Sequence, residues 1–123
     1  MNLLRAAVLL ALCSLLPGCF YGVGCTDSFT PSFTLKVVDA EGRAVPDIRV
    51  VYMLDGSPWH EAQCTSIPVA PGVCEEWWAI HDKPGMFRIR VETLDGTRSA
   101  EKNVTVGGDM CHANTETVQL TLL

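Results

Sequence analysis

Basic residues are scarce in this chain, and long apolar runs are almost absent. Lysine and arginine together number 9, against 14 aspartate and glutamate residues, so the formal net charge is −5 over 123 residues. Nucleic-acid-binding proteins need clustered cations to neutralise phosphates. The balance therefore argues against nucleic acid as a partner, and against a basic membrane-surface patch. The longest uninterrupted apolar run, 6–13, lies at the N-terminus and is too short to span a bilayer.

Motifs of metal sites and catalytic sites are also missing. The chain has no Cys-x-x-Cys, no His-x-x-x-His and no Gly-x-Ser-x-Gly, the spacings typical of zinc sites and hydrolase nucleophiles. His81 and Asp82 are sequence neighbours at an expected turn, and this arrangement does not indicate a catalytic base with an orienting carboxylate. We therefore predict a protein without catalysis, cofactor or metal. The alternative is a metal-binding or hydrolytic accessory protein that uses His60, His81 and His112.

The N-terminus has the layout of an export signal. One cation, Arg5, precedes the almost wholly apolar stretch 6–16, and Leu16-Pro17-Gly18-Cys19 follows. This tetrapeptide resembles the lipobox of bacterial lipoproteins, in which a small residue precedes a cysteine that takes a thioether-linked lipid. The resemblance implies a signal peptide over residues 1–18 and a membrane anchor on Cys19, with acyl chains such as palmitate. An ordinary cleaved signal with a structural Cys19 is the alternative.

The same resemblance implies a location. Phe20, rather than an aspartate, follows the lipidated cysteine, and by Gram-negative sorting habits this predicts the outer membrane. A second candidate for the lipid is Cys25, which follows Gly22-Val23-Gly24.

Cysteine counting favours Cys19 as the anchor. Cys13 lies in the signal and Cys19 under lipid, which leaves four cysteines: Cys25, Cys64, Cys74 and Cys111. In an exported chain four cysteines predict two disulfides, with three connectivities. In one of these, Cys64 pairs with Cys74 across a local loop, and Cys25 pairs with Cys111. If Cys25 carried the lipid instead, one of the three remaining cysteines would be unpaired.

Beyond the signal, apolar residues alternate with polar ones, and turn signals recur at regular spacing. This pattern is typical of short β-strands, and no helical period of 3.6 is present outside the signal. We expect strands over 33–38, 48–54, 74–81, 87–92, 99–106 and 117–122, with 59–72 the least regular stretch. The prediction is an antiparallel β-sandwich of about seven strands over residues 32–123, joined to the anchor by a tether over 19–31.

Two motifs in these strands carry a family resemblance. The segment 33–50 contains Asp39-Ala40-Glu41-Gly42-Arg43-Ala44-Val45-Pro46 and then Ile48-Arg49-Val50. It resembles the opening of carboxypeptidase-regulatory-like domains, and Gly85-Met86-Phe87-Arg88-Ile89-Arg90-Val91 is similar to a later strand of that family. The segment 109–120 resembles members found in secreted bacterial lipoproteins. The resemblance implies a transthyretin-like, Ig-like sandwich that acts as an accessory module rather than as a peptidase.

Three tryptophans are the candidate ligand-surface residues: Trp59, Trp77 and Trp78. Neighbouring strand positions face opposite sides of a sheet, so one of Trp77 and Trp78 is expected inside and the other outside. An exposed indole can stack on a sugar ring or on a partner protein, whereas the other interpretation places both in the core. We therefore expect a binding or structural module of the cell envelope, whose partner is an envelope protein or polysaccharide.

Overall fold

The computed structural model of the chain describes residues 24–65 and 70–123, and these residues form eight β-strands and no helix. Accordingly, nothing helical within these ranges could cross a membrane. The predicted signal peptide and Cys19 lie outside the described residues. The strands are β1 Phe33–Val38, β2 Ile48–Leu54, β3 His60–Glu61, β4 Gln63–Cys64, β5 Trp77–Trp78, β6 Gly85–Thr93, β7 Ser99–Val106 and β8 Glu116–Thr121.

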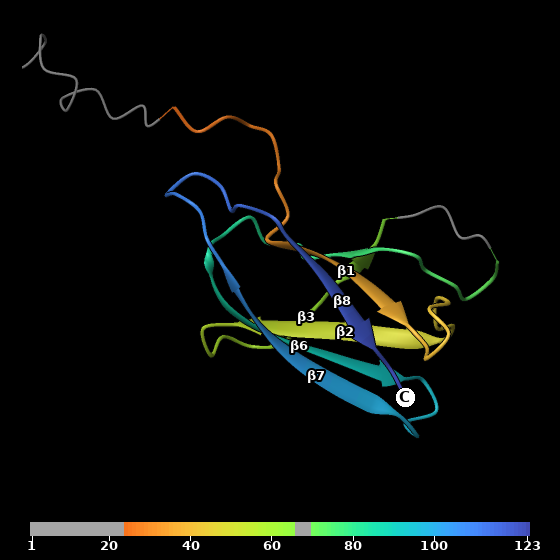
Figure 1. Cartoon of the computed structure of the whole chain (residues 1–123). Helices are drawn as coiled ribbons and strands as arrows, with labels where there is room; N and C mark the ends of the chain where they lie inside the picture. The colour runs from red at the N-terminus through yellow and green to blue at the C-terminus, as the bar shows by residue number, and fades with distance from the viewer. Residues whose placement is uncertain (1–23, 66–69) are drawn as a thin grey trace, which may run out of the picture.

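The strands form two four-stranded sheets that pack as a sandwich (Figure 1). One sheet has the order β4-β5-β1-β8 and the other the order β3-β2-β6-β7. The all-β sandwich predicted from the sequence is confirmed. Antiparallel pairing holds throughout except between β1 and β8, which are parallel. No hairpin constrains this pair, because the whole second sheet lies between the two strands in the chain, and such a crossover allows parallel pairing.

The core lies between the sheets and is built from the inward-facing side chains of the long strands. The burial of β1 alternates along its length, and that of β6 does so even more regularly, which is the period-two signal read from the sequence. Phe33 makes edge-to-face contacts with Tyr52 and Phe87, with ring centroids 5.2 and 5.6 Å apart. The aromatic cluster therefore joins the two sheets, since Phe33 belongs to one and its two partners to the other.

The stretch expected to be least regular, 59–72, contains two of the shortest strands. β3 belongs to one sheet and β4 to the other, so the chain changes sheets at Ala62. This residue is buried, and its N–H donates to the carbonyl of Val50. The strand expected over 74–81 is limited to β5, a two-residue strand that pairs with both β1 and β4. Strands of two residues carry too few alternating positions to be recognised by period.

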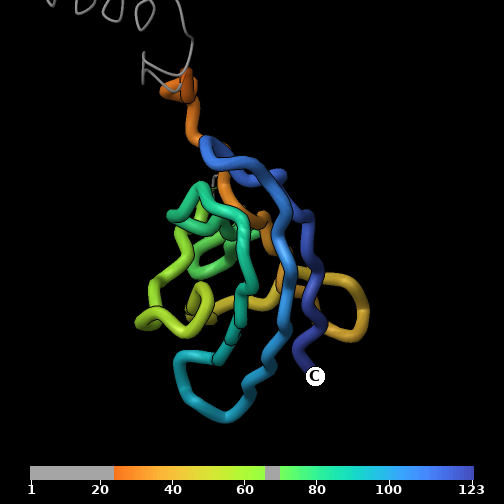
Figure 2. Tube along the Cα trace, turned by 90° about the vertical axis from the view of Figure 1, so that its left-hand side faces the viewer, coloured from red at the N-terminus to blue at the C-terminus, as the bar shows by residue number. Residues whose placement is uncertain are grey.

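The two ends of the sandwich differ in what they hold. Residues 24–32 and the loop 107–114 lie at one end, and the C-terminus and the turn 94–97 lie at the other (Figure 2). The segment 79–83 runs beside the start of β1, where the Ser32 N–H donates to the carbonyl of His81. We call the three segments 24–32, 79–83 and 107–114 the clamp end.

Candidate functional site

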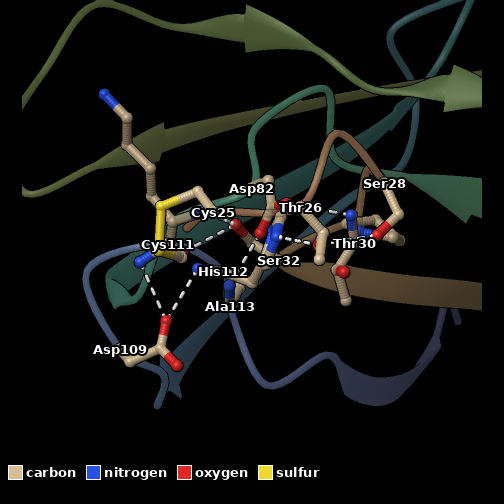
Figure 3. A network of polar contacts seen from close by, with 12 residues as sticks. Cys25, Thr26, Ser28, Thr30, Ser32, Asp82, Asp109, Cys111, His112 and Ala113 are labelled. Carbon is tan, nitrogen blue, oxygen red and sulfur yellow. Dashed lines mark hydrogen bonds and ion pairs between the residues drawn. A yellow bond between two sulfur atoms is a disulfide. The ribbon is translucent and has the colours of Figure 1, made fainter. Parts of the chain in front are cut away.

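A covalent and polar network fastens the N-terminal segment to the domain at the clamp end (Figure 3). A disulfide joins Cys25, before β1, to Cys111, in the loop before β8. Beside it, Thr26 Oγ1 lies 2.8 Å from His112 Nε2, and His112 Nδ1 lies 2.5 Å from Asp82 Oδ2. Residues 25–31, which fall within the expected tether, are thus held against the sandwich from Cys25 onwards.

The Asp82 carboxylate is the centre of this network. Its Oδ2 accepts the Thr30 N–H at 3.0 Å as well as the contact with His112, and its Oδ1 accepts the Ala113 N–H at 2.7 Å. Burial would raise the pKa of Asp82, but the donated hydrogen bonds outweigh it and hold that pKa below its usual value. Asp82 is thus an anion that ties all three segments of the clamp end together.

Two further side chains set the shape of these segments. The Ser32 hydroxyl is fully buried; it accepts the Lys83 N–H and lies within hydrogen-bonding distance of the carbonyls of His81 and Lys83. In the loop 107–114, Oδ1 of Asp109 accepts the N–H groups of both Cys111 and His112. His112 therefore reaches Asp82 from a loop in which the amides of Cys111 and His112 already have an acceptor.

The order carboxylate, imidazole, hydroxyl is that of an acid–base triad, and the sequence did not predict it. Asp82 orients His112, and not its sequence neighbour His81. To act as a base, the imidazole must be neutral, but the hydrogen bond to Asp82 raises the pKa of His112. When protonated, His112 can donate from Nδ1 to Asp82 and from Nε2 to Thr26, so it links the two segments structurally. Only after it loses its proton could His112 take one from Thr26.

The other two histidines lie together, next to the core. Their rings are 4.6 Å apart between centroids, and His81 Nδ1 lies 2.6 Å from the hydroxyl of the fully buried Tyr52. Burial, together with the charges of His60 and Lys83, lowers the pKa of His81. Neutral His81 accepts a hydrogen bond from the Tyr52 hydroxyl at Nδ1, while the Tyr52 oxygen accepts the Ile80 N–H. This pair therefore ties β2 to the segment after β5.

The three histidines do not form a metal site. His60 and His81 face each other, whereas His112 binds Asp82 and Thr26. Within residues 24–65 and 70–123, no group of three histidine, cysteine, aspartate or glutamate side chains could hold a metal ion.

The three tryptophans occupy different places. Trp77 packs against the core, and its indole Nε1 is buried with no hydrogen-bond partner among the described residues. Trp78, on the other side of β5, is half-buried and donates from Nε1 to Glu76 Oε1 at 2.6 Å. Trp59 is 40% exposed and immediately precedes β3 of the other sheet, and the Arg88 guanidinium lies 5.9 Å from its ring centroid. The expected ligand surface of three tryptophans is thus divided, and Trp59 is the most accessible member.

Two hollows adjoin these tryptophans. One of about 300 Å³ is mainly apolar and lies beside Trp77 and the second disulfide, Cys64–Cys74. The other, of about 250 Å³, lies on the outer face of the second sheet and is lined by Arg49, Val51, Trp59, Arg90 and Glu92.

Both disulfides follow one of the three connectivities that the sequence allowed, with Cys25 bonded to Cys111 and Cys64 to Cys74. Sequence reasoning missed Thr26 and Asp82 as partners of His112, because 86 and 30 positions separate them from it and no local motif links them. Comparisons with protein-family models, with curated proteins and with solved structures each find no match to this chain.

Proposed function

We propose that this chain is an exported, lipid-anchored module of the cell envelope that acts by binding rather than by catalysis. Its ligand surface is the outer face of the β3-β2-β6-β7 sheet around Trp59, and its partner is an envelope polysaccharide or protein. The accessible Trp59 beside three arginines on this outer sheet face is the observation that carries this proposal.

The strand register defines that face. Arg49 pairs with Glu92, and Val51 pairs with Arg90. These positions alternate with the core residues of the same strands, and Val51 is itself buried. Tryptophan and arginine dominate the binding energy of most interfaces. An indole offers a stacking surface, and a guanidinium offers a planar set of donors that fits carboxylates and hydroxyl groups.

The arginines of this face are available to a ligand at little cost. Arg49 and Arg88 lie 2.7 Å from Glu61 and Glu101 respectively, but all four side chains are at least one-third exposed. Exposed ion pairs of this kind contribute only about 0–1 kcal/mol to stability. A ligand can therefore take over one partner of a pair without a large loss to the fold.

The anchor proposal is supported by the cysteine pairing. Because Cys25 is bonded to Cys111, its thiol is not available for a lipid, and Cys19 remains as the lipobox cysteine. Two disulfides also fit an exported protein, since thiols are kept reduced in the cytosol. The proposed location is the outer membrane, because Phe20, and not an aspartate, follows Cys19.

Intact mass spectrometry of the protein extracted from membranes tests the anchor. We expect a mature chain that begins at Cys19 and carries acyl chains, and the Cys19→Ser variant should lose them. The matched control is Cys13→Ser, inside the signal peptide, which should leave lipidation intact. A lipid that persists in Cys19→Ser would refute the assignment.

Co-sedimentation with isolated envelope polysaccharide tests the binding surface. We expect Trp59→Ala to weaken binding by about tenfold or more, as for an interface anchor. Trp78→Ala, on the other sheet, serves as the control and should bind like the unmodified chain. Equal loss in both variants, or none in either, would contradict the choice of this face; if only a protein partner binds, the polysaccharide half of the proposal is wrong.

A hydrolytic activity is the second candidate, and the carboxylate–imidazole–hydroxyl order at the clamp end is what favours it. Hydrolysis of an activated acetate ester should then require Thr26 and His112 and should rise with pH as His112 loses its proton. Thr26→Val should abolish it, whereas Ser28→Ala, which removes only the neighbouring hydroxyl, should not. Identical rates in Thr26→Val and the unmodified chain would exclude this candidate.

A further inference from the structure

We infer that the clamp end of the sandwich rests on the surface of the lipid bilayer, so that the domain stands end-on on its membrane. The contact surface consists of three exposed apolar side chains: Phe29, Ile80 and Met110. This inference rests on the proposed lipidation of Cys19 and adds an orientation to it.

The first step is the length of the connection between lipid and domain. Six residue steps separate Cys19 from Cys25, and a fully extended chain of that length reaches about 20 Å. Without the disulfide, the connection would continue to the start of β1 at Phe33 and could reach about twice as far. Because Cys25 is bonded to Cys111, the clamp end is the part of the domain closest to the anchor.

The second step is what this end exposes. Each of the three clamp segments presents one large apolar side chain: Phe29 is 51% exposed, Ile80 42% and Met110 85%. The clamp contacts bring the three segments together, through Cys25–Cys111, Thr30–Asp82 and Asp82–His112. Exposed apolar side chains can enter the headgroup region of the bilayer and strengthen membrane binding. They add to the lipid anchor, because a single acyl chain alone binds only weakly and reversibly.

The third step concerns the backbone, whose unsatisfied polar groups are costly in an apolar medium. In the loop that carries Met110, five of the six backbone amides of residues 109–114 donate to an acceptor. Those of Cys111 and His112 donate to the Asp109 carboxylate, and that of Ala113 donates to Asp82. The amides of Asp109 and Asn114 close the loop on backbone carbonyls. The loop can therefore approach the headgroups without exposing these donors.

Charge opposes this orientation only weakly. The Asp82 carboxylate is paired with His112, and Oδ1 of the exposed Asp109 accepts two amides of its own loop. The exposed Lys83 and Asp27 carry opposite charges, so Asp109 is left as one exposed anion beside the contact surface. The contact is therefore mainly apolar, as expected for a chain whose net charge of −5 gives no general attraction to anionic lipids.

Methionine oxidation by hydroxyl radicals measures the orientation directly. Lipidated mature protein is reconstituted into vesicles of phosphatidylethanolamine and phosphatidylglycerol, and the unlipidated Cys19→Ser chain in solution is the reference. We expect the oxidation rate of Met110 on vesicles to be at least about threefold lower than in the reference, because its side chain lies in the headgroup region of the bilayer. Met86, 63% exposed on the outer face of the second sheet, should be oxidised equally in both states.

Two variants of the lipidated protein extend the test. Phe29→Asp should return the oxidation of Met110 towards the rate in solution, whereas Leu94→Asp, on the exposed turn at the opposite end, should not. The double variant Cys25→Ala/Cys111→Ala should reduce the protection, because only the polar contacts of Thr26 and Thr30 then hold the N-terminal segment at the clamp end. Oxidation is measured well below the melting temperature of every variant, as found by thermal melting, and Leu94→Asp controls for the added charge.

The outcomes separate the orientation from the anchor. If Cys19 carries lipid but Met110 is oxidised as fast on vesicles as in solution, only the orientation is wrong, and the domain does not rest on the bilayer. Protection of Met86 in place of Met110 also overturns it, because the domain would then lie on its sheet face. The absence of lipid from Cys19 in the intact mass overturns the anchor, and the orientation with it.

Discussion

The two disulfides of this domain fasten regions of opposite character. Cys25–Cys111 joins residues 86 positions apart, and its surroundings are polar, with Asp82, His112 and Thr26 bonded in series. Cys64–Cys74 joins residues only 10 positions apart, and the neighbouring hollow is mainly apolar, with the Trp77 indole N–H finding no partner among the described residues.

The difference shows two ways in which disulfides can stabilise a small β-sandwich domain. The long-range disulfide restricts most of the unfolded chain, and the ionic contacts beside it fix the direction in which the N-terminal segment leaves the domain. The local disulfide restricts one irregular loop and holds β4 close to β5. The first therefore affects the whole fold and the path of the N-terminal segment, and the second affects mainly the edge of one sheet.

The largest expected effect is the loss of the long-range disulfide. In the chain-entropy account, closing a loop of this length contributes about 4.6 kcal/mol to the free energy of unfolding. We expect the Cys25→Ala/Cys111→Ala double variant to lose about that much, measured by urea unfolding. Since small domains are stable by only about 5–15 kcal/mol, this variant should be close to its folding limit at 37 °C.

The local disulfide, Cys64–Cys74, should contribute less to the free energy of unfolding than Cys25–Cys111 does. The same account gives about 2.7 kcal/mol for a loop of ten residues, so Cys64→Ala/Cys74→Ala should be the more stable of the two double variants. Urea unfolding of both, in one buffer, measures the difference. If the local variant proved the less stable, the polar clamp and not the long-range disulfide would be what holds the N-terminal segment.

The contrast between these regions also explains how much could be read from the sequence. The sequence alternation of the long strands predicted the sandwich, and β1, β6 and β8 do have one buried and one more exposed face. The parallel pairing of β1 with β8 was not predictable by this means, since alternation carries no information on strand direction. The clamp could not be predicted either, because Thr26, Asp82 and His112 meet only after both sheets have packed.

Asp82 is the test of whether the polar contacts add to the first disulfide. It uses both carboxylate oxygens as acceptors, whereas Asp109 uses only Oδ1. Asp82→Asn replaces one acceptor by a donor that faces another donor, and we expect a loss of about 2 kcal/mol in the free energy of unfolding. Asp109→Asn keeps its one accepting oxygen and should change stability by less than half as much. Equal effects would mean that the clamp is not centred on Asp82.

The clamp should also respond to pH in a definite direction. The pKa of His112 is raised, so its contribution is complete below the ordinary histidine value of about 6.5 and is lost as pH rises through the folded-state value. The pKa of Asp82 is lowered, so its contribution is complete above about 3.9 and is lost as pH falls through the lower, folded-state value. The stability difference between the unmodified chain and His112→Asn should therefore be largest between about pH 4 and 6.5.

His81 provides the opposite case. Its pKa is lowered, so its contribution is lost as pH falls below the ordinary histidine value. Urea unfolding at several pH values should show the His81→Asn difference growing as pH rises towards about 6.5, and the His112→Asn difference shrinking only as pH rises above that value. Two parallel curves would contradict the assignment of His112 to an ionic contact and of His81 to a neutral one.

The smallest expected effect lies beside the second disulfide, at Trp77. An unpartnered buried N–H costs about 1–3 kcal/mol, and Trp77→Phe removes it together with part of a packed ring. The two terms oppose each other, so urea unfolding should show a net change of less than about 1 kcal/mol. Trp78→Phe removes the same ring but also a hydrogen bond to Glu76, so it should lose stability without any compensation. A large loss in Trp77→Phe would show that the indole N–H has a partner, and the two disulfide regions would then be less different in polarity than the described residues indicate.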